Sequence, residues 1–373
     1  MPPSSLFEKS STFSGVYTMM IVNRMQMLYF FIIMPRYLVK PYMIWGILGV
    51  GLLSQINLML LAKLFSSNYY AKGYPGFVQL FGKNAVRFFT FLGLFPILVK
   101  IDVLTLGVGE VVHQYIFPSM NSNWLLLSIF LVCFYVAVQG MEKTIRFVVI
   151  VFLSTIWMLI IFCPFFFPPI ASLHDLYPLI PHDWSGISWS GLLLVWTSMS
   201  GPEMLVYLAP WLSPKQKMLK YLTIANTIST LEYLLLFTAA LLFFGSNYLD
   251  KTRFPVLDMI RYLQFPAYER IDIVLISLHM FVLVFVNSIL MLLFYGAIRI
   301  LMGKGEEQTT LKGFTASLLI IFVSSLIINQ WFWKSGGEQN IWMNLQIGVG
   351  AFTYFLVPTF LLVATKLKGC FKA

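Results

Sequence analysis

Charged side chains are scarce in this sequence. Only 11% of its 373 residues are charged and 59% are hydrophobic, with a mean hydropathy of +0.81. A soluble domain is typically about a quarter charged and about half apolar. Because so few polar groups remain to cover a surface in water, we predict a polytopic membrane protein that is membrane domain over nearly all of its length.

The sequence also lacks the patterns of several other protein classes. Its three cysteines, Cys133, Cys163 and Cys370, are scattered and form no CxxC pair, which argues against a disulfide framework and a cysteine-based metal site. There is no His-Glu-x-x-His, nucleophile elbow, P-loop or glycine-rich dinucleotide turn. We therefore expect no enzymatic activity, no metal and no cofactor.

The basic residues are not arranged as in a nucleic-acid-binding protein, although the net charge is +10. They lie at the ends of apolar segments, where they act as determinants of membrane topology. We expect a lipid bilayer and no nucleic acid among the partners.

Ten apolar segments have about the length that a membrane-spanning helix needs. They are Ser14–Met34, Tyr42–Phe65, Arg87–Phe117, Trp124–Gln139, Thr144–Phe166, Ser188–Trp211, Met218–Gly245, Ile271–Leu301, Phe314–Gln330 and Ile341–Thr365. The third is overlong and must tilt or extend beyond the bilayer, and the fourth is short. We predict an all-α transmembrane domain over residues 14–365, between tails of residues 1–13 and 366–373.

The distribution of Lys and Arg predicts the orientation. With the N-terminus in the cytoplasm, roughly 16 of these residues lie inside and roughly 7 outside. The outer loop at residues 165–187 carries none. We therefore expect both termini in the cytoplasm and an even number of spans.

The sixth segment is interrupted at its centre by Ser200, Gly201, Pro202 and Glu203. Proline removes a helical hydrogen bond and crowds the preceding turn. Backbone groups left open at membrane depth must be satisfied by protein or by a wet cavity. An ionisable side chain at such a break is typical of a transporter ligand site. The alternative is a proline-kinked helix in which Glu203 is neutral and hydrogen-bonded to a neighbouring helix.

Ten spans divide into two halves, residues 14–166 and 188–365, which would insert in opposite orientations. The first span then corresponds to the sixth. It carries its own polar stretch, Asn23-Arg24-Met25-Gln26, so we predict that both helices are interrupted and meet at half-depth.

Three motifs resemble those of the endospore germination permeases, the B-type membrane subunits of nutrient germinant receptors. The first is Pro35-Arg36 with Trp45, and the second is Ser200-Gly201-Pro202-Glu203-Met204 with Pro210. The third and most specific runs from Phe254-Pro255 through Arg261 to Glu269-Arg270-Ile271-Asp272. The chain departs from the family pattern in having no glycine at residues 23–26 and in carrying His279 where a Trp is usual.

This resemblance covers essentially the whole chain and implies a distant member of the amino acid–polyamine–organocation transporter superfamily, with its LeuT-like inverted repeat. It implies a receptor subunit in the inner membrane of the spore or the cell membrane. Such a subunit binds a small-molecule germinant, such as an amino acid, at the bilayer midplane and signals to other receptor subunits. The alternative is a proton-coupled amino acid transporter.

Several buried ionisable residues allow more than one interpretation. Arg24 either pairs with Glu203 or binds the carboxylate of a ligand. Lys100 either serves ligand or proton binding or forms a salt bridge, for example with Glu232, which we interpret as a structural interhelical contact. The predicted ligand-binding residues are Asn23, Arg24, Gln26, Lys100, Ser200, Gly201, Glu203 and His279.

Two segments are expected to lie outside the membrane. Residues 249–272 carry four acids and four bases, and we predict a short helix from Pro255 to Leu263 lying on the bundle. The pairs His174-Asp175 and His182-Asp183 lie in an outer loop without further ligands, so we interpret them as solvated residues and not as a metal site.

Overall fold

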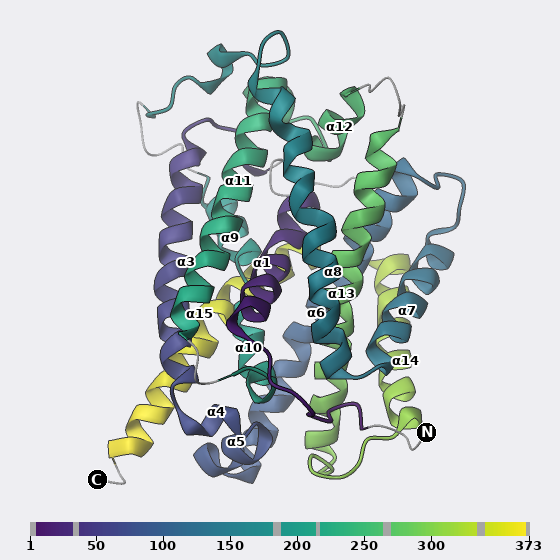
Figure 1. Cartoon of the computed structure of the whole chain (residues 1–373). Coiled ribbons are helices and arrows are strands. Elements are labelled where there is room, and N and C mark those ends of the chain that lie inside the picture. The colour runs from purple at the N-terminus through teal and green to yellow at the C-terminus, as the bar shows by residue number, and fades with distance from the viewer. Residues whose placement is uncertain are drawn as a thin grey trace.

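The protein is an all-helical bundle in the computed structural model (Figure 1). The structure describes residues 5–32, 37–181, 188–213, 217–263, 270–333 and 340–370. Pro35-Arg36, His182-Asp183 and Glu269 lie outside these residues. Within them the chain forms helices, and extended backbone pairs only at an isolated bridge between Phe13 and Leu212.

The elements follow one another as a series of long helices with short connecting ones. The α-helices are α1 (Gly15–Ile32), α3 (Met43–Phe65), α4 (Asn68–Ala71), α5 (Tyr74–Phe81), α6 (Lys83–Tyr115), α7 (Ser122–Val138), α8 (Met141–Ile156), α9 (Trp189–Ser198), α10 (Leu205–Leu208), α11 (Met218–Leu249), α12 (Pro255–Tyr262), α13 (Ile271–Leu301), α14 (Leu311–Trp331) and α15 (Ile341–Cys370). The 3-10 helices are η1 (Trp157–Phe166), η2 (Leu173–Leu176), η4 (Pro202–Met204) and η5 (Ala209–Trp211).

The polytopic membrane class is confirmed. Within the described residues, eight helical stretches are long and apolar enough to cross a membrane. Helices α1 and α7 lie alongside them in the bundle (Figure 1), but α7 has 17 residues and α1 contains Asn23, Arg24 and Gln26. The number of ten spans therefore stays a prediction. The overlong third segment is confirmed as the 33-residue helix α6.

The long helices pack as two groups. Helices α1 and α3 each pack against both α9 and α11, and α6, α7, α13 and α14 form a second contiguous set. Helix α8 packs against α1 and α13, and α15 packs against α3, α6 and α9. In a chain of two five-helix halves, α3 corresponds to α11 and α6 to α13, and both of these pairs are among the most extensive contacts. The boundaries of the two halves stay a prediction.

The sixth predicted span is broken where the sequence indicates. Helix α9 ends at Ser198, Gly201 has φ +140°, and the chain resumes as the short helix η4 at Pro202. This φ is open to glycine and strained for other residues, and Pro202 has no N–H to continue the helix of α9. The glycine also permits close approach, because a Cβ at this position would lie 2.7 Å from the Cβ of Met25.

The predicted interruption of the first span is wrong. Helix α1 continues without a break from Gly15 to Ile32, through Asn23-Arg24-Met25-Gln26. The stretch contains no glycine or proline. Its polar side chains find partners on neighbouring helices, so the backbone hydrogen bonds of the helix need not open to satisfy them.

The first and last described residues lie at the same end of the bundle (Figure 1). Helix α12 lies at the opposite end and packs against α11 and α13, as predicted for the segment from Pro255 to Leu263. This arrangement agrees with an even number of crossings, while the side of the membrane that each end faces stays a prediction.

Gly201→Ala is expected to lower the free energy of unfolding by about 1–3 kcal/mol, because the new side chain meets Met25 in a backbone conformation that strains non-glycine residues. The measurement is thermal unfolding of the purified protein in detergent. Gly107→Ala is the matched control. A Cβ there meets no atom within 4 Å, and replacing a mid-helix glycine stabilises by up to about 1 kcal/mol. Equal unfolding midpoints for the two variants would contradict the strained break.

Candidate functional site

The break in the sixth span brings a carboxylate and an ammonium group together. Glu203 lies in η4 and is 2% exposed, and Lys100 lies in α6 and is 4% exposed. The Glu203 Oε1 lies 3.8 Å from the Lys100 Nζ, and the Lys100 Nζ donates to the Ser200 Oγ at 3.2 Å. The sequence allowed either a functional role for Lys100 or a salt bridge, for example with Glu232. The pairing with Glu232 is wrong, because Lys100 faces Glu203.

Glu203 also satisfies the backbone that the break leaves open. Its Oε2 accepts a hydrogen bond of 2.6 Å from the N–H of Gly201, which is one of the groups that a continuous helix would have paired internally. The carboxylate therefore makes two kinds of contact. One oxygen accepts from the backbone at the break, and the other faces Lys100, the only cation that contacts it among the described residues.

A small cavity lies beside this pair, and the tenth predicted span forms one of its walls. Its volume is about 10 Å³, room for roughly one water molecule. The lining residues are Pro96, Lys100, Glu203, Met204, Gln346, Val349, Gly350 and Thr353. A ligand the size of an amino acid therefore requires the walls to move apart.

Sequence reasoning missed the contribution of α15 to this cavity. Gln346, Gly350 and Thr353 follow one another at helical spacing on a single face. Gln346 is 2% exposed, and its Oε1 accepts no hydrogen bond from the described residues. The signal available in the sequence was this line of a polar, a small and a hydroxyl residue within an apolar helix.

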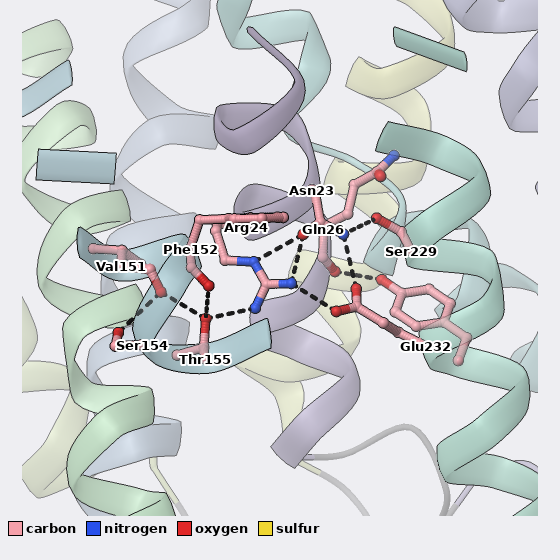
Figure 2. Close-up of polar contacts among 10 residues, drawn as sticks. Asn23, Arg24, Gln26, Val151, Phe152, Ser154, Thr155, Ser229 and Glu232 are labelled. Carbon is pink, nitrogen blue, oxygen red and sulfur yellow. Dashed lines mark hydrogen bonds and ion pairs between the residues drawn. The ribbon is translucent and has the colours of Figure 1, made fainter. Parts of the chain in front are cut away.

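A second charged network lies between α1, α8 and α11 (Figure 2). The Arg24 Nη2 lies 2.6 Å from the Glu232 Oε1, and Asn23 donates to the other oxygen of Glu232 at 2.8 Å. The remaining guanidinium donors reach Thr155 on α8 at 2.7 Å and Asn23 at 2.9 Å. Both charged side chains are 2% exposed, so they form a desolvated pair in which every guanidinium nitrogen and both carboxylate oxygens have a hydrogen-bond partner.

The predicted pairing of Arg24 with Glu203 is wrong, because Arg24 pairs with Glu232. The reason is the continuity of α1. In an unbroken helix the Arg24 side chain points toward α8 and α11, while Met25, the next residue along, contacts Gly201 at the break. The geometry favours the structural alternative for Arg24, with its donors engaged by protein groups; a contact with a ligand stays a hypothesis.

Gln26 connects α1 to the open end of α9. Its Nε2 donates to the carbonyl of Met199 at 3.1 Å. The Tyr233 hydroxyl, from α11, donates to the carbonyl of Gln26 and lies 3.0 Å from that of Ser198. These contacts satisfy carbonyl oxygens that the break leaves without helical partners.

The eight predicted site residues therefore do not form one site. Lys100, Ser200, Gly201 and Glu203 come together at the cavity. Asn23 and Arg24 belong to the network with Glu232, and Gln26 lies between the two. His279, on α13, is buried within electrostatic range of Arg24 and does not line the cavity.

The α12 end of the bundle is held by a separate polar cluster. Tyr115 donates to Asp258 at 2.7 Å, and Arg270 contacts Asp272 at 2.8 Å and the Tyr115 carbonyl at 2.9 Å. Burial raises the pKa of Asp258, against the opposing effects of the Tyr115 hydrogen bond and the charge of Arg261. These contacts tie α12 to the ends of α6 and α13, as expected of a structural element.

No group of three or more His, Cys, Asp or Glu in the described chain could hold a metal ion.

Comparison with known proteins connects this architecture to a family. A family model described as "Spore germination protein" matches residues 12–332. Spore germination protein GerQB of Bacillus cereus is 28% identical over 264 residues, which cover 69% of each chain.

Two solved transporters share the fold. Mhp1, a nucleobase-cation-symport-1 family transporter in a closed conformation with bromovinylhydantoin bound, aligns over 96% of this chain and 81% of its own, with 12% identity and a TM-score of 0.55. The manganese transporter of Eremococcus coleocola, in complex with an aromatic bis-isothiourea substituted compound, aligns over 94% of this chain and 77% of its own, with 12% identity and a TM-score of 0.50. The predicted LeuT-like fold is confirmed.

Removing either partner of the buried Arg24–Glu232 pair is expected to lower the free energy of unfolding by about 3–5 kcal/mol, because it leaves an uncompensated charge in the bundle. Arg24→Ala, Glu232→Ala and the double variant would be compared by thermal unfolding. The double variant is expected to lose much less than the sum of the two single losses.

The pair Glu142–Arg146 is the matched control. Its Nη2–Oε1 distance is also 2.6 Å, but the Arg146 side chain is 56% exposed. The same cycle there is expected to give a coupling of only about 0.3–0.5 kcal/mol. Additive losses at Arg24 and Glu232 would show that the two charges do not stabilise each other.

Proposed function

The chain belongs to the spore germination protein family, and we propose that it is a membrane subunit of a nutrient-germinant receptor that binds a zwitterionic small molecule, such as an amino acid, at the broken sixth span. The observation that carries this proposal is the Lys100–Glu203 pair, buried beside a cavity at the helix break. Binding changes the conformation of the bundle, and partner subunits in the membrane respond to that change.

The charges of the pair suit an amino acid. The ligand's carboxylate would take the place of Glu203 at the Lys100 ammonium, and its ammonium group would take the place of Lys100 at Glu203. The Oε1 of Gln346, which accepts no hydrogen bond from the described residues, supplies a further acceptor for the ligand's N–H groups. Every charge then keeps an opposite partner, which a desolvated site requires.

The small volume of the cavity supports signalling through a conformational change. A ligand shifts an equilibrium only by its differential affinity for the two states. The closed cavity has room for roughly one water molecule, so an amino acid can bind only a more open state. Its binding would therefore populate a conformation in which η4, α6 and α15 have moved apart.

The second candidate is a proton-coupled amino acid transporter, since two solved transporters have the same fold. The same fold serves receptors and carriers alike. Uptake of labelled amino acids into proteoliposomes separates the two: accumulation driven by a pH gradient supports transport, whereas saturable binding without accumulation supports a receptor.

We expect Lys100→Met/Glu203→Gln to weaken amino acid binding by at least about tenfold, equivalent to about 1.4 kcal/mol, because both charges that hold the ligand are gone. Removing both charges together leaves neither of them buried without its partner, so the bundle is expected to fold. The measurement is calorimetric titration of the purified protein with a panel of amino acids, beside an assay of nutrient-triggered spore germination in a deletion strain carrying each variant.

Glu142→Gln is the control, since it also removes one carboxylate but at the surface end of α8, away from the cavity. It is expected to bind amino acids and restore germination as the unaltered chain does. Unchanged binding and germination in the double variant would remove the Lys100–Glu203 pair from the mechanism.

A further inference from the structure

A second carboxyl group is buried in the bundle, away from the cavity. Asp102, on α6, is 0% exposed. Its Oδ1 is hydrogen-bonded to the hydroxyl of Ser325 on α14, which is also 0% exposed. The hydroxyl of Ser324 also lies near the carboxyl group, but Oδ2 has no partner at hydrogen-bond geometry among the described residues. Residues two apart on a helix do not face each other, so Asp102 points away from the side of α6 that carries Lys100.

No described cation forms an ion pair with Asp102. Helix α7 has no charged residue, and α5 has none. The only charged residue of α14 is Lys312 in its first turn, thirteen positions before Ser325 and therefore roughly 20 Å away along the helix. Other charged or titratable groups lie on α6 itself and on the helices packed against it. No ion pair or hydrogen bond joins any of these described groups to Asp102.

Among the described side chains, these groups are Tyr17 and Arg24 on α1, Lys83, Arg87, Lys100, Glu110, His113 and Tyr115 on α6, Cys133 and Tyr135 on α7, Asp272, His279, Tyr295 and Arg299 on α13, Tyr354, Lys366 and Lys368 on α15, and Tyr74 on α5. None of them is recorded in a salt bridge or hydrogen bond with Asp102.

An ionised carboxylate in this position would be severely destabilising. Burying an isolated charge costs far more than burying a neutral polar group, and the group neutralises instead. A protonated Asp102 removes that cost. One carboxyl oxygen then carries the proton, and the hydroxyl of Ser325 can donate or accept as the carboxyl group requires. A neutral acid also tolerates one oxygen without a partner better than a carboxylate does.

We propose that Asp102 is a proton-binding site in the wall between α6 and α14, occupied at neutral pH in this closed conformation. The ligand is a proton that converts the carboxylate to a carboxylic acid, and Ser325 positions it. Releasing the proton would require α6 and α14 to separate far enough for water to enter. The site does not depend on the proposed function, because neither Asp102 nor Ser325 lines the cavity.

Infrared spectroscopy of the full-length protein labelled with ¹³C-aspartate, purified in detergent, tests this directly. At pH 7 we expect a C=O stretch of a protonated carboxylic acid that shifts on labelling and disappears in Asp102→Asn. This substitution mimics the neutral acid in shape, so the fold is expected to persist. Ser325→Ala should shift the band to higher frequency, because the carbonyl loses its hydrogen bond.

Asp272→Asn is the matched control. Asp272 is 1% exposed but contacts Arg270 and Arg261, so its carboxylate is compensated and its replacement should leave the acid band unchanged. Absence of any acid band that depends on Asp102 at pH 7 would overturn the proposal. A band that is present in choline buffer and lost on adding Na⁺ or K⁺ would also overturn it, because the ligand would then be a monovalent cation. If Asp102→Asn does not fold, the labelled band and its shift in Ser325→Ala still decide the question.

Discussion

A charge at membrane depth must meet an opposite charge, and this requirement organises the interior of the bundle. Arg24 and Glu232 meet it by joining α1 to α11, with Thr155 of α8 completing the contacts of the guanidinium. Lys100 and Glu203 meet it by joining α6 to the broken sixth span. Each pair connects segments that are far apart in the sequence, so the fold brings distant charges together where hydrocarbon would otherwise surround them.

The two pairs are built differently, and the difference agrees with a structural role for the first and with the ligand-binding role proposed for the second. Arg24 and Glu232 are 2.6 Å apart, and further hydrogen bonds occupy the remaining donors and the second carboxylate oxygen. Lys100 and Glu203 are 3.8 Å apart, beside a cavity and with the neighbouring Gln346 oxygen unsatisfied. A fully satisfied network resists rearrangement, whereas a loose pair with a spare acceptor can exchange its partners for those of a ligand.

The sequence was a good guide where backbone chemistry decides the outcome. Gly201 and Pro202 predict the broken helix because one permits an unusual φ and the other lacks an N–H, and the structure has the break at those residues. The sequence was a poor guide to pairing. The acid that pairs with Arg24 is decided by the direction in which its side chain leaves α1. Because α1 is continuous, Arg24 points toward Glu232 and not toward Glu203.

The contribution of α15 was missed for a related reason. Gln346, Gly350 and Thr353 share one face of an apolar helix, but such a line of residues is equally typical of an interhelical contact. Only the packing of α15 against α6 and η4 brings Gln346 to the cavity that Lys100 and Glu203 line. The spacing of these residues indicates a polar helix face, but a single sequence does not show which segments that face meets.

In the proposed function, the electrostatic energy of the Lys100–Glu203 pair bears on how large a conformational shift a ligand could drive. Two unit charges 3.8 Å apart attract each other by about 4 kcal/mol at an effective dielectric constant of roughly 20. A zwitterion inserted between them would replace this one attraction with two of similar size, before the cost of removing its own charges from water is counted. Moving a two-state equilibrium from 1:99 to 99:1 takes about 5.5 kcal/mol of differential affinity. The gross attraction at the pair is of the same order as this requirement, and the cost of taking the charges of the zwitterion out of water is subtracted from it.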